Sequence, residues 1–251
     1  MTGNYYDSTR GISEYLTFHY GGFPHRVPDA LADGLRFPVR CVSECLDPSR
    51  LPERARALDL GCAVGRSSFE LARHCAEVIG IDYSGRFIDV ATHLRNNGSF
   101  GFGYIDEGAL TVPHQAVVPP EIDRGRVRFE RGDAMNPRDG LGQFEVVLMA
   151  NLIDRLNNPV QCLQKIHAFL PAGGQLIVTS PYTWMEDYTP RQNWLGGFAR
   201  NGRRVESFEA LKDLLEPHFE LTRRQDLPFV LREHARKFQL GFADATSWLR
   251  K

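Results

Sequence analysis

The feature that most constrains the fold of this chain is the segment LDLGCAVG at residues 58–65. It places Asp59 near the end of a short apolar run, residues 55–60, and then passes through Gly61 and Gly65 into residues 65–75, which have a helical period. Glycine lets the backbone approach a ligand at the first position and lets the helix start pack tightly at the second. The segment therefore predicts a strand, a tight turn and a helix, with a ligand beside the turn.

After this segment, short apolar runs alternate with longer segments of helical period. Such alternation is typical of βαβ units around a parallel sheet, and it predicts an α/β fold. Ser84 is placed to cap one helix, and the pair Gly173 and Gly174 to end another. The further predicted strands are residues 78–81, 127–130, 144–150 and 175–180, and the predicted helices are residues 85–95 and 159–170.

Two stretches interrupt this alternation of strands and helices, and a third stretch precedes it. Residues 96–126 form a long connection rich in glycine and proline, and residues 181–205 carry two tryptophans and two tyrosines without a clear period. The amphipathic segment 12–20 comes before the sheet. We expect a single domain over 1–251, in which 1–50 form an N-terminal helical cap or substrate lid, 51–180 the cofactor-binding core, and 181–251 an aromatic loop and a closing β-hairpin.

The composition bears on partners and location. Thirty basic and 31 acidic residues give a net charge of -1, which offers no broad attraction to nucleic acid or to an anionic membrane and favours a small-molecule substrate. No apolar run has transmembrane length and no signal peptide is evident, so we expect a cytoplasmic protein. The cysteines are odd in number and lack a CxxC pair, which argues against disulfides and against a metal site: Cys41, Cys45, Cys62, Cys75 and Cys162.

Three acidic residues follow three successive predicted strands. Asp59 suits the ammonium group of the methionine part of S-adenosylmethionine (SAM), whose carboxylate could take exposed amides of the glycine turn, Asp82 suits both ribose hydroxyls, and Asp133 suits the adenine amino group. A NAD-binding turn would need the spacing GxGxxG, which is absent. The cofactor-binding residues expected for SAM are Asp59, Gly61, Cys62, Gly65, Asp82, Tyr83, Gly132, Asp133, Ala134 and Asn151.

With these motifs, residues 55–180 resemble the class I SAM-dependent methyltransferases. The resemblance implies a Rossmann-like, mostly parallel sheet of seven strands with an antiparallel last strand and helices on both faces. Residues 219–227 and 237–248 can form the closing hairpin that such a sheet requires.

Segments outside these motifs resemble a narrower family, the 4-mercaptohistidine (5-thiohistidine) N1-methyltransferases of ovothiol biosynthesis, in their stand-alone form. The resemblance implies methyl transfer from SAM to the imidazole nitrogen of 5-thiohistidine, giving ovothiol A and S-adenosylhomocysteine. It also implies that a separate sulfoxide synthase of the same pathway works with this chain. The segments are YYDSTRGISEYLTFHYG near the N-terminus, FPVRCV at 37–42, NLIDRL from residue 151, SPYTW from residue 180 and LREHARKFQ from residue 231.

Ligands of open α/β sheets bind beyond the carboxyl ends of the strands, and this rule selects the substrate-side candidates. For contact with the imidazole or the thiol we expect Asn151, Tyr182, His19 and Tyr20. For the amino-acid part of the substrate and the lid we expect Tyr15, Asp154, Arg155, Trp184, Arg232 and His234, with Arg191, Glu186 and Glu14 as further candidates.

Three other functions stay open from the sequence. The chain could methylate another small nucleophile, such as a different imidazole, an amine or a thiol. It could bind SAM without catalysis, although the intact acidic residues and glycines disfavour this. A NAD-dependent oxidoreductase is disfavoured by the glycine spacing.

Overall fold

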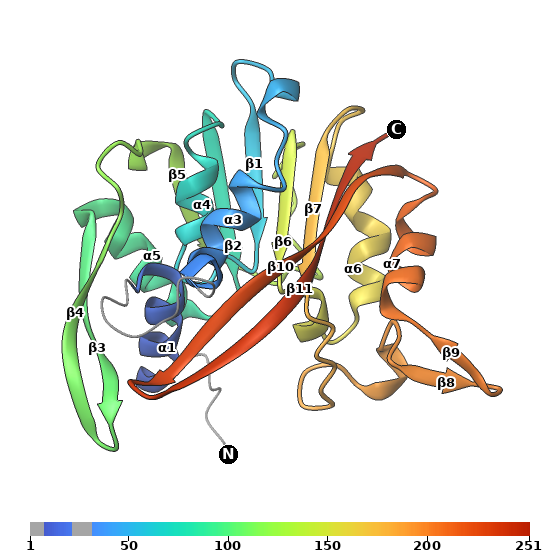
Figure 1. Ribbon diagram of the computed structural model, residues 1–251. Coiled ribbons are helices and arrows are strands. Elements are labelled where there is room, and N and C mark those ends of the chain that lie inside the picture. The colour runs from blue at the N-terminus through green and yellow to red at the C-terminus, as the bar shows by residue number, and fades with distance from the viewer. Residues whose placement is uncertain (1–7, 22–31) are drawn as a thin grey trace.

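The computed structural model describes residues 8–21 and 32–251, and its centre is a seven-stranded sheet (Figure 1). The strand order is β10-β11-β7-β6-β1-β2-β5, and β11 runs antiparallel to both of its neighbours. The predicted seven-stranded, mostly parallel sheet is confirmed. Its strands are β1 (Arg56–Leu60), β2 (Glu77–Asp82), β5 (Val127–Arg131), β6 (Val146–Ala150), β7 (Gln175–Ser180), β10 (Phe219–His234) and β11 (Lys237–Arg250).

Helices cover both faces of the sheet, and each face has its own hydrophobic cluster. Along β1, Ala57 belongs to one cluster and Leu58 and Leu60 belong to the other, as the two-residue period of a strand requires. The central strands β6 and β7 are almost wholly buried, which explains why their sequences are continuous apolar runs. The first face carries α1 (Thr9–Tyr20), α3 (Phe37–Ser43), α4 (Arg66–Leu71) and α5 (Gly85–Asn97), and the second carries α6 (Pro159–Lys165) and α7 (Ser207–Leu215).

The long connection of residues 96–126 contains regular structure that the sequence analysis did not predict. These residues contain a β-hairpin of β3 (Ser99–Glu107) and β4 (Leu110–Val117), which forms a separate two-stranded sheet at the side of the molecule. Phe100, Phe102 and Tyr104 alternate with other residues along β3, which is a strand period. Glycines lie between these aromatic residues, and glycine is uncommon in strands, so the sequence analysis did not identify a strand here.

Other boundaries also differ from those predicted. The helix expected over 65–75 ends at Leu71, and the one expected over 159–170 continues beyond Lys165 as a 3-10 turn. The aromatic stretch 181–205 contains a short hairpin, β8 (Phe198–Arg200) and β9 (Arg203–Val205), and β10 runs on past residue 227. The 3-10 turns are η2 (Asp33–Arg36), η3 (Pro48–Arg50), η4 (Arg124–Arg126), η5 (Ile153–Arg155), η6 (Ile166–Phe169) and η7 (Arg191–Asn193).

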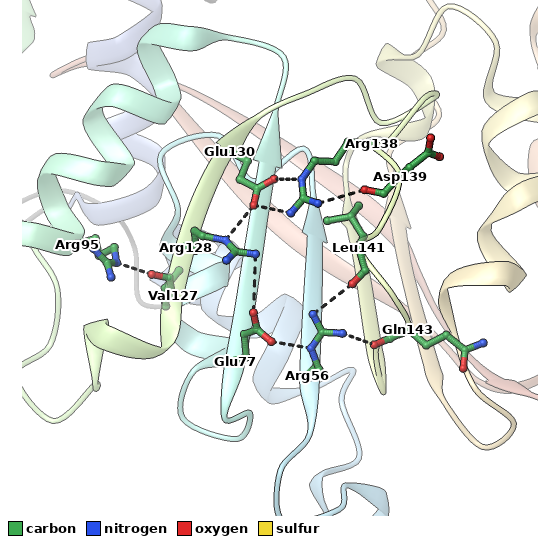
Figure 2. A network of polar contacts seen from close by, with 10 residues as sticks. All are labelled: Arg56, Glu77, Arg95, Val127, Arg128, Glu130, Arg138, Asp139, Leu141 and Gln143. Carbon is green, nitrogen blue, oxygen red and sulfur yellow. Dashed lines mark hydrogen bonds and ion pairs between the residues drawn. The ribbon is translucent and has the colours of Figure 1, made fainter.

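A network of ion pairs lies across β1, β2 and the edge strand β5 (Figure 2). Arg56 Nε lies 2.6 Å from Glu77 Oε2, and Arg128 Nη2 lies 3.8 Å from Glu77 Oε1. Glu130 then accepts from Arg128 Nε at 2.9 Å and from Arg138 Nε at 2.7 Å. Charged side chains of this kind discourage pairing of an edge strand with another chain.

No helix among residues 8–21 and 32–251 has the length and apolar character needed to span a membrane.

Candidate functional site

Because five strands of the sheet are parallel neighbours, the residues that follow them meet at one edge of the sheet. Asp59 and Asp82 lie at the ends of β1 and β2, and Asp133 follows β5. Asn151 follows β6, and Tyr182 follows β7. The candidate site is therefore this carboxyl edge.

Asp59 is buried, at 1% exposure, and among the described residues only one of its oxygens has a hydrogen-bond partner. Its Oδ2 accepts from Ser68 Oγ at 2.6 Å, whereas Oδ1 has no partner within the described part of the chain. Burial raises the pKa of this carboxyl to about 7; the Ser68 hydrogen bond opposes that rise, and the charge of Asp82 adds to it. A buried acceptor oxygen without a partner fits the ammonium group of the SAM methionine moiety.

The glycine turn adopts the conformation that its sequence predicts. Gly61 and Gly65 have φ values of +76° and +84°, and a Cβ on Gly65 would lie 2.5 Å from the Phe129 ring, so only glycine fits there. The amides of Gly61 and Cys62 both donate to Ile81 O, at 2.8 and 3.1 Å. These two amides are therefore occupied by the protein and are not among the exposed amides that the SAM carboxylate could take.

Asp82 is held in one orientation by two backbone amides. Its Oδ2 accepts from Ala63 N and its Oδ1 from Ser84 N, both at 2.9 Å. Each carboxylate oxygen has two lone pairs, so an oxygen that accepts from an amide can also accept from a ribose hydroxyl. The neighbouring Tyr83 side chain is exposed.

Residues 132–134, which follow β5, are hydrogen-bonded to the end of β2. Gly132 N donates to Asp82 O at 2.9 Å, so Asp133 follows directly after a residue that is bonded to the end of β2. Asp133 Oδ1 accepts from Met135 N at 2.9 Å, and Ala134 O accepts from Cys162 Sγ at 3.4 Å. These contacts give the segment the fixed shape that an adenine pocket needs.

The ends of β6 and β7 are strained. Asn151 and Tyr182 have φ values of 50° and 51°, a left-handed conformation that is uncommon for residues other than glycine. Thr179 Oγ1 donates to Asn151 Oδ1 at 2.9 Å, and the Tyr182 hydroxyl donates to Asp244 Oδ2 at 3.0 Å. Burial and the charge of Asp244 raise the pKa of Tyr182. The hydroxyl proton of Tyr182 is therefore used in the bond to Asp244, so the hydroxyl oxygen could only accept a hydrogen bond from a ligand.

Asp154 joins the end of β6 to the segment after β7. It is fully buried, and its Oδ2 accepts from Arg155 Nη1 and Thr183 N, each at 3.0 Å. Its Oδ1 has no hydrogen-bond partner within residues 8–21 and 32–251, and burial raises the pKa of the carboxyl. The Arg155 guanidinium lies 5.0 Å from the Tyr188 ring centroid, so Arg155 also holds this segment.

The end of α1 lies against the glycine turn. The Tyr20 hydroxyl donates to Val64 O at 2.9 Å, and the Tyr15 ring packs on Phe87 at 4.7 Å between centroids. His19 Nδ1 is buried without a partner in the described structure. Burial, assisted by the charge of Arg66, lowers the pKa of His19 to about 3, so its imidazole is neutral.

Arg232, His234 and Trp184 make contacts within the protein. Arg232 Nη1 donates to Ile105 O at 2.6 Å and joins the tip of the β10–β11 hairpin to the β3–β4 hairpin. His234 Nδ1 accepts from Arg236 N at 3.3 Å at that tip. Trp184 Nε1 donates to Ser207 Oγ at 2.8 Å, and its ring stacks on Trp194.

The sequence analysis did not identify four residues of this edge: Ser68, Arg66, Thr179 and Asp244. Arg66 directly follows Gly65, so its position in the motif could have indicated it. Asp244 lies 62 residues from Tyr182, and no local pattern signals that contact. Across the described residues, no group of three or more metal-ligating side chains gathers at one place.

Known proteins share this fold and parts of this sequence. A profile of the methyltransferase domain family matches residues 25–218. The magnesium-protoporphyrin O-methyltransferase of Rhodobacter capsulatus is 36% identical over 109 residues, which are 42% of this chain but only 37% of that protein.

Solved structures show the same fold at low sequence identity. The magnesium protoporphyrin IX methyltransferase of Synechocystis PCC 6803 with bound SAM has a TM-score of 0.59 at 14% identity, over 98% of this chain and 94% of that one. The 4+2 cyclase SpnF has a TM-score of 0.57 at 17% identity, with the same two coverages. Since the family profile matches most of its length, the chain belongs to the methyltransferase domain family and is a SAM-dependent methyltransferase domain.

Proposed function

We propose that this chain transfers the methyl group of SAM to the imidazole nitrogen of 5-thiohistidine, giving ovothiol A and S-adenosylhomocysteine. SAM is the methyl donor. A separate sulfoxide synthase would supply the thiohistidine, and both proteins would work in the cytoplasm.

The observation that carries this proposal is the pairing of the segments that resemble the thiohistidine methyltransferases. The NLIDRL segment contacts the SPYTW segment through Asp154 and Thr183. The N-terminal segment contacts the FPVRCV segment through Phe18 and Phe37, whose rings stack at 5.8 Å. Segments distant in sequence therefore form two joined pairs, one at the ends of β6 and β7 and one beside α1.

The unpartnered atoms at this edge support a substrate that donates hydrogen bonds. Asp154 Oδ1 is an acceptor, and His19 Nδ1 lies on a neutral imidazole. An amino acid with an ammonium group and an imidazole N–H satisfies such atoms, and buried polar groups are rarely left unsatisfied. Asp154 is fully buried, so the segment that starts at Thr183 must shift before an ammonium group reaches it.

Bound SAM supplies an electrophilic methyl group on its sulfonium. Asp59 and Asp82 bind and orient the cofactor, and positioning of the reacting atoms can be worth about 7 to 11 kcal/mol. The sulfur of 5-thiohistidine is the better nucleophile, so the protein must hold it out of line. Asn151 and Tyr182 are suited to this because strain and hydrogen bonds to Thr179 and Asp244 fix their positions.

A second candidate is methylation of a tetrapyrrole carboxylate, favoured by the 36% identity to the Rhodobacter capsulatus enzyme. A carboxylate nucleophile only accepts hydrogen bonds, so it could not supply a donor to an acceptor such as Asp154 Oδ1. The site chemistry therefore ranks this candidate second.

One experiment separates the two functions. The purified chain is incubated with SAM and either 5-thiohistidine or magnesium protoporphyrin IX, and products are identified by mass spectrometry and NMR. We expect an N-methyl group on the imidazole, and the Asp59→Asn variant should show no turnover. Methylation of the porphyrin alone, or of neither compound by a chain that binds SAM, would refute the thiohistidine assignment.

A further inference from the structure

We infer that Ser68 is a positioning residue for cofactor binding, whose hydroxyl group holds Asp59 so that the second carboxylate oxygen, Oδ1, is left for the ammonium group of SAM. This role requires the proposed contact of Asp59 with SAM. It is independent of which acceptor receives the methyl group.

The hydroxyl of Ser68 lies inside the protein, next to the carboxyl group of Asp59. Ser68 belongs to α4 and is fully buried, and its Oγ donates to Asp59 Oδ2 at 2.6 Å. An ionised carboxylate only accepts hydrogen bonds, so the proton in this bond comes from Ser68. Asp59 Oδ1 has no partner in the described part of the chain. The two oxygens therefore differ, because the protein fixes Oδ2 and leaves Oδ1 for a ligand.

A glycine in the neighbouring strand makes room for this hydroxyl. Gly80 of β2 lies directly opposite Asp59 of β1 in the sheet. A Cβ on Gly80 would lie 2.9 Å from Ser68 Oγ and 2.7 Å from the Phe129 ring, which is too close for either group. Only glycine at this position lets α4 approach the sheet so closely. The close approach brings the Ser68 hydroxyl to the carboxyl group of Asp59.

The hydroxyl of Ser68 also affects the charge of Asp59. Burial raises the pKa of the Asp59 carboxyl to about 7, the hydrogen bond from Ser68 opposes that rise, and the charge of Asp82 adds to it. A hydrogen bond donated to a carboxylate stabilises the ionised form. That form is the one that can pair with an ammonium group. Ser68 therefore contributes both the orientation and the charge that the contact with SAM needs.

The test measures SAM affinity against pH by calorimetry, from about pH 6 to 8.5, for the wild type, Ser68→Ala and Ser67→Ala. Ser67→Ala is the matched control, because Ser67 is also buried in α4 and its hydroxyl donates to Pro38 O at 2.9 Å. In Ser68→Ala we expect the fall in affinity to begin about one pH unit higher, so that affinity at pH 7 drops about 10-fold. Ser67→Ala should keep the wild-type profile. The amino group of SAM titrates identically in all three measurements, so only differences between proteins are compared.

A double variant tests whether the effect acts through Asp59. In the Asp59→Asn background, Ser68→Ala should change SAM affinity less than about 2-fold. An unchanged pH profile in folded Ser68→Ala, or an equal loss in both backgrounds, would overturn the inference. Ser68→Cys keeps a weaker donor and should give an intermediate profile, and it replaces Ser68→Ala if that variant does not fold. All of these measurements use SAM alone, so they remain decisive if 5-thiohistidine is not methylated.

Discussion

At the residue scale, the proposed contact of Asp59 with the cofactor would make cofactor binding depend on pH. The pKa of Asp59 is raised to about 7, chiefly by burial, and only the ionised form can pair with the ammonium group of SAM. Below pH 7 the free protein must lose a proton before SAM binds. We therefore predict that SAM affinity falls up to about 10-fold for each pH unit below 7, measured by calorimetry between pH 5.5 and 8. In Asp59→Asn the affinity should be weak and independent of pH over this range; an unchanged slope would exclude Asp59 as its source.

The same raised pKa has a consequence for stability. A carboxyl whose folded pKa lies above its unfolded value of 3.8 favours folding in its protonated form. That contribution is fully present below pH 3.8 and is lost as the pH rises through 7. At pH 8 without ligand, Asp59→Asn should therefore melt at a higher temperature than the wild type, by roughly 2 to 4 °C for each kcal/mol recovered in a domain of this size. Equal or lower melting temperatures in scanning calorimetry would show that the buried charge is already compensated.

At the element scale, α1 belongs partly to the core and partly to the site. Ile12 and Leu16 are buried in the cluster on the first face, so deleting the helix would remove core packing as well as a lid. The proposed lid also includes residues 1–7 and 22–31, which lie outside the described residues. Tyr20→Phe tests the helix more selectively, because it removes only the hydroxyl that bonds to Val64 O.

We predict that Tyr20→Phe lowers kcat/KM about 10-fold with an unchanged circular dichroism spectrum, since the hydrogen bond that holds α1 on the turn is worth about 1 kcal/mol or slightly more. Tyr188→Phe is the control, as its hydroxyl is remote from that turn in sequence. Wild-type turnover in Tyr20→Phe would show that the Tyr20–Val64 hydrogen bond is not needed for activity.

The strained residues at the ends of β6 and β7 allow a prediction of which substrate atom is methylated. Asn151→Ala and Tyr182→Ala should lower the rate, and should raise the fraction of S-methyl product if these residues hold the sulfur out of line. Tyr182→Phe should give a smaller effect than Tyr182→Ala, because the ring stays while the bond to Asp244 is lost. NMR distinguishes N-methyl from S-methyl signals. If both alanine variants keep the wild-type rate and give only N-methyl product, Asn151 and Tyr182 do not determine which atom is methylated.

At the scale of the whole molecule, β5 is an edge strand of the sheet, and the ion-pair network crosses from β1 and β2 to it (Figure 2). Exposed ion pairs contribute about 0 to 1 kcal/mol, so stability is a weak reason for the network. We predict that Arg128→Val with Glu130→Val changes the melting temperature by only a few degrees but causes concentration-dependent light scattering, because an apolar edge strand pairs with other copies. Lys212→Val with Glu216→Val on α7 provides a control without a strand edge, and equal scattering of both variants would contradict the edge explanation.

Local patterns in the sequence predicted the fold class, and they are the basis for the proposed cofactor site at the carboxyl edge of the sheet. Periodicity located the strands and helices of the core, and local spacing located the glycine turn and the acids Asp59, Asp82 and Asp133. Both are short-range properties, because a strand, a turn and a cap are each specified within a few residues. The β3–β4 hairpin was not predicted, because glycines lie between the alternating aromatic residues of β3.

Which polar groups have hydrogen-bond partners depends on contacts between residues that are far apart in the sequence. Arg232 lies 127 residues from Ile105, and Tyr182 lies 62 residues from Asp244, so no local pattern could reveal that these candidates already have partners. The same holds for the unpartnered atoms of Asp59, Asp154 and His19, whose burial results from the packing of separate elements. Hydrogen-bond satisfaction depends on every neighbour in space, and for that reason only the folded chain distinguishes a group that binds a ligand from one that binds the protein.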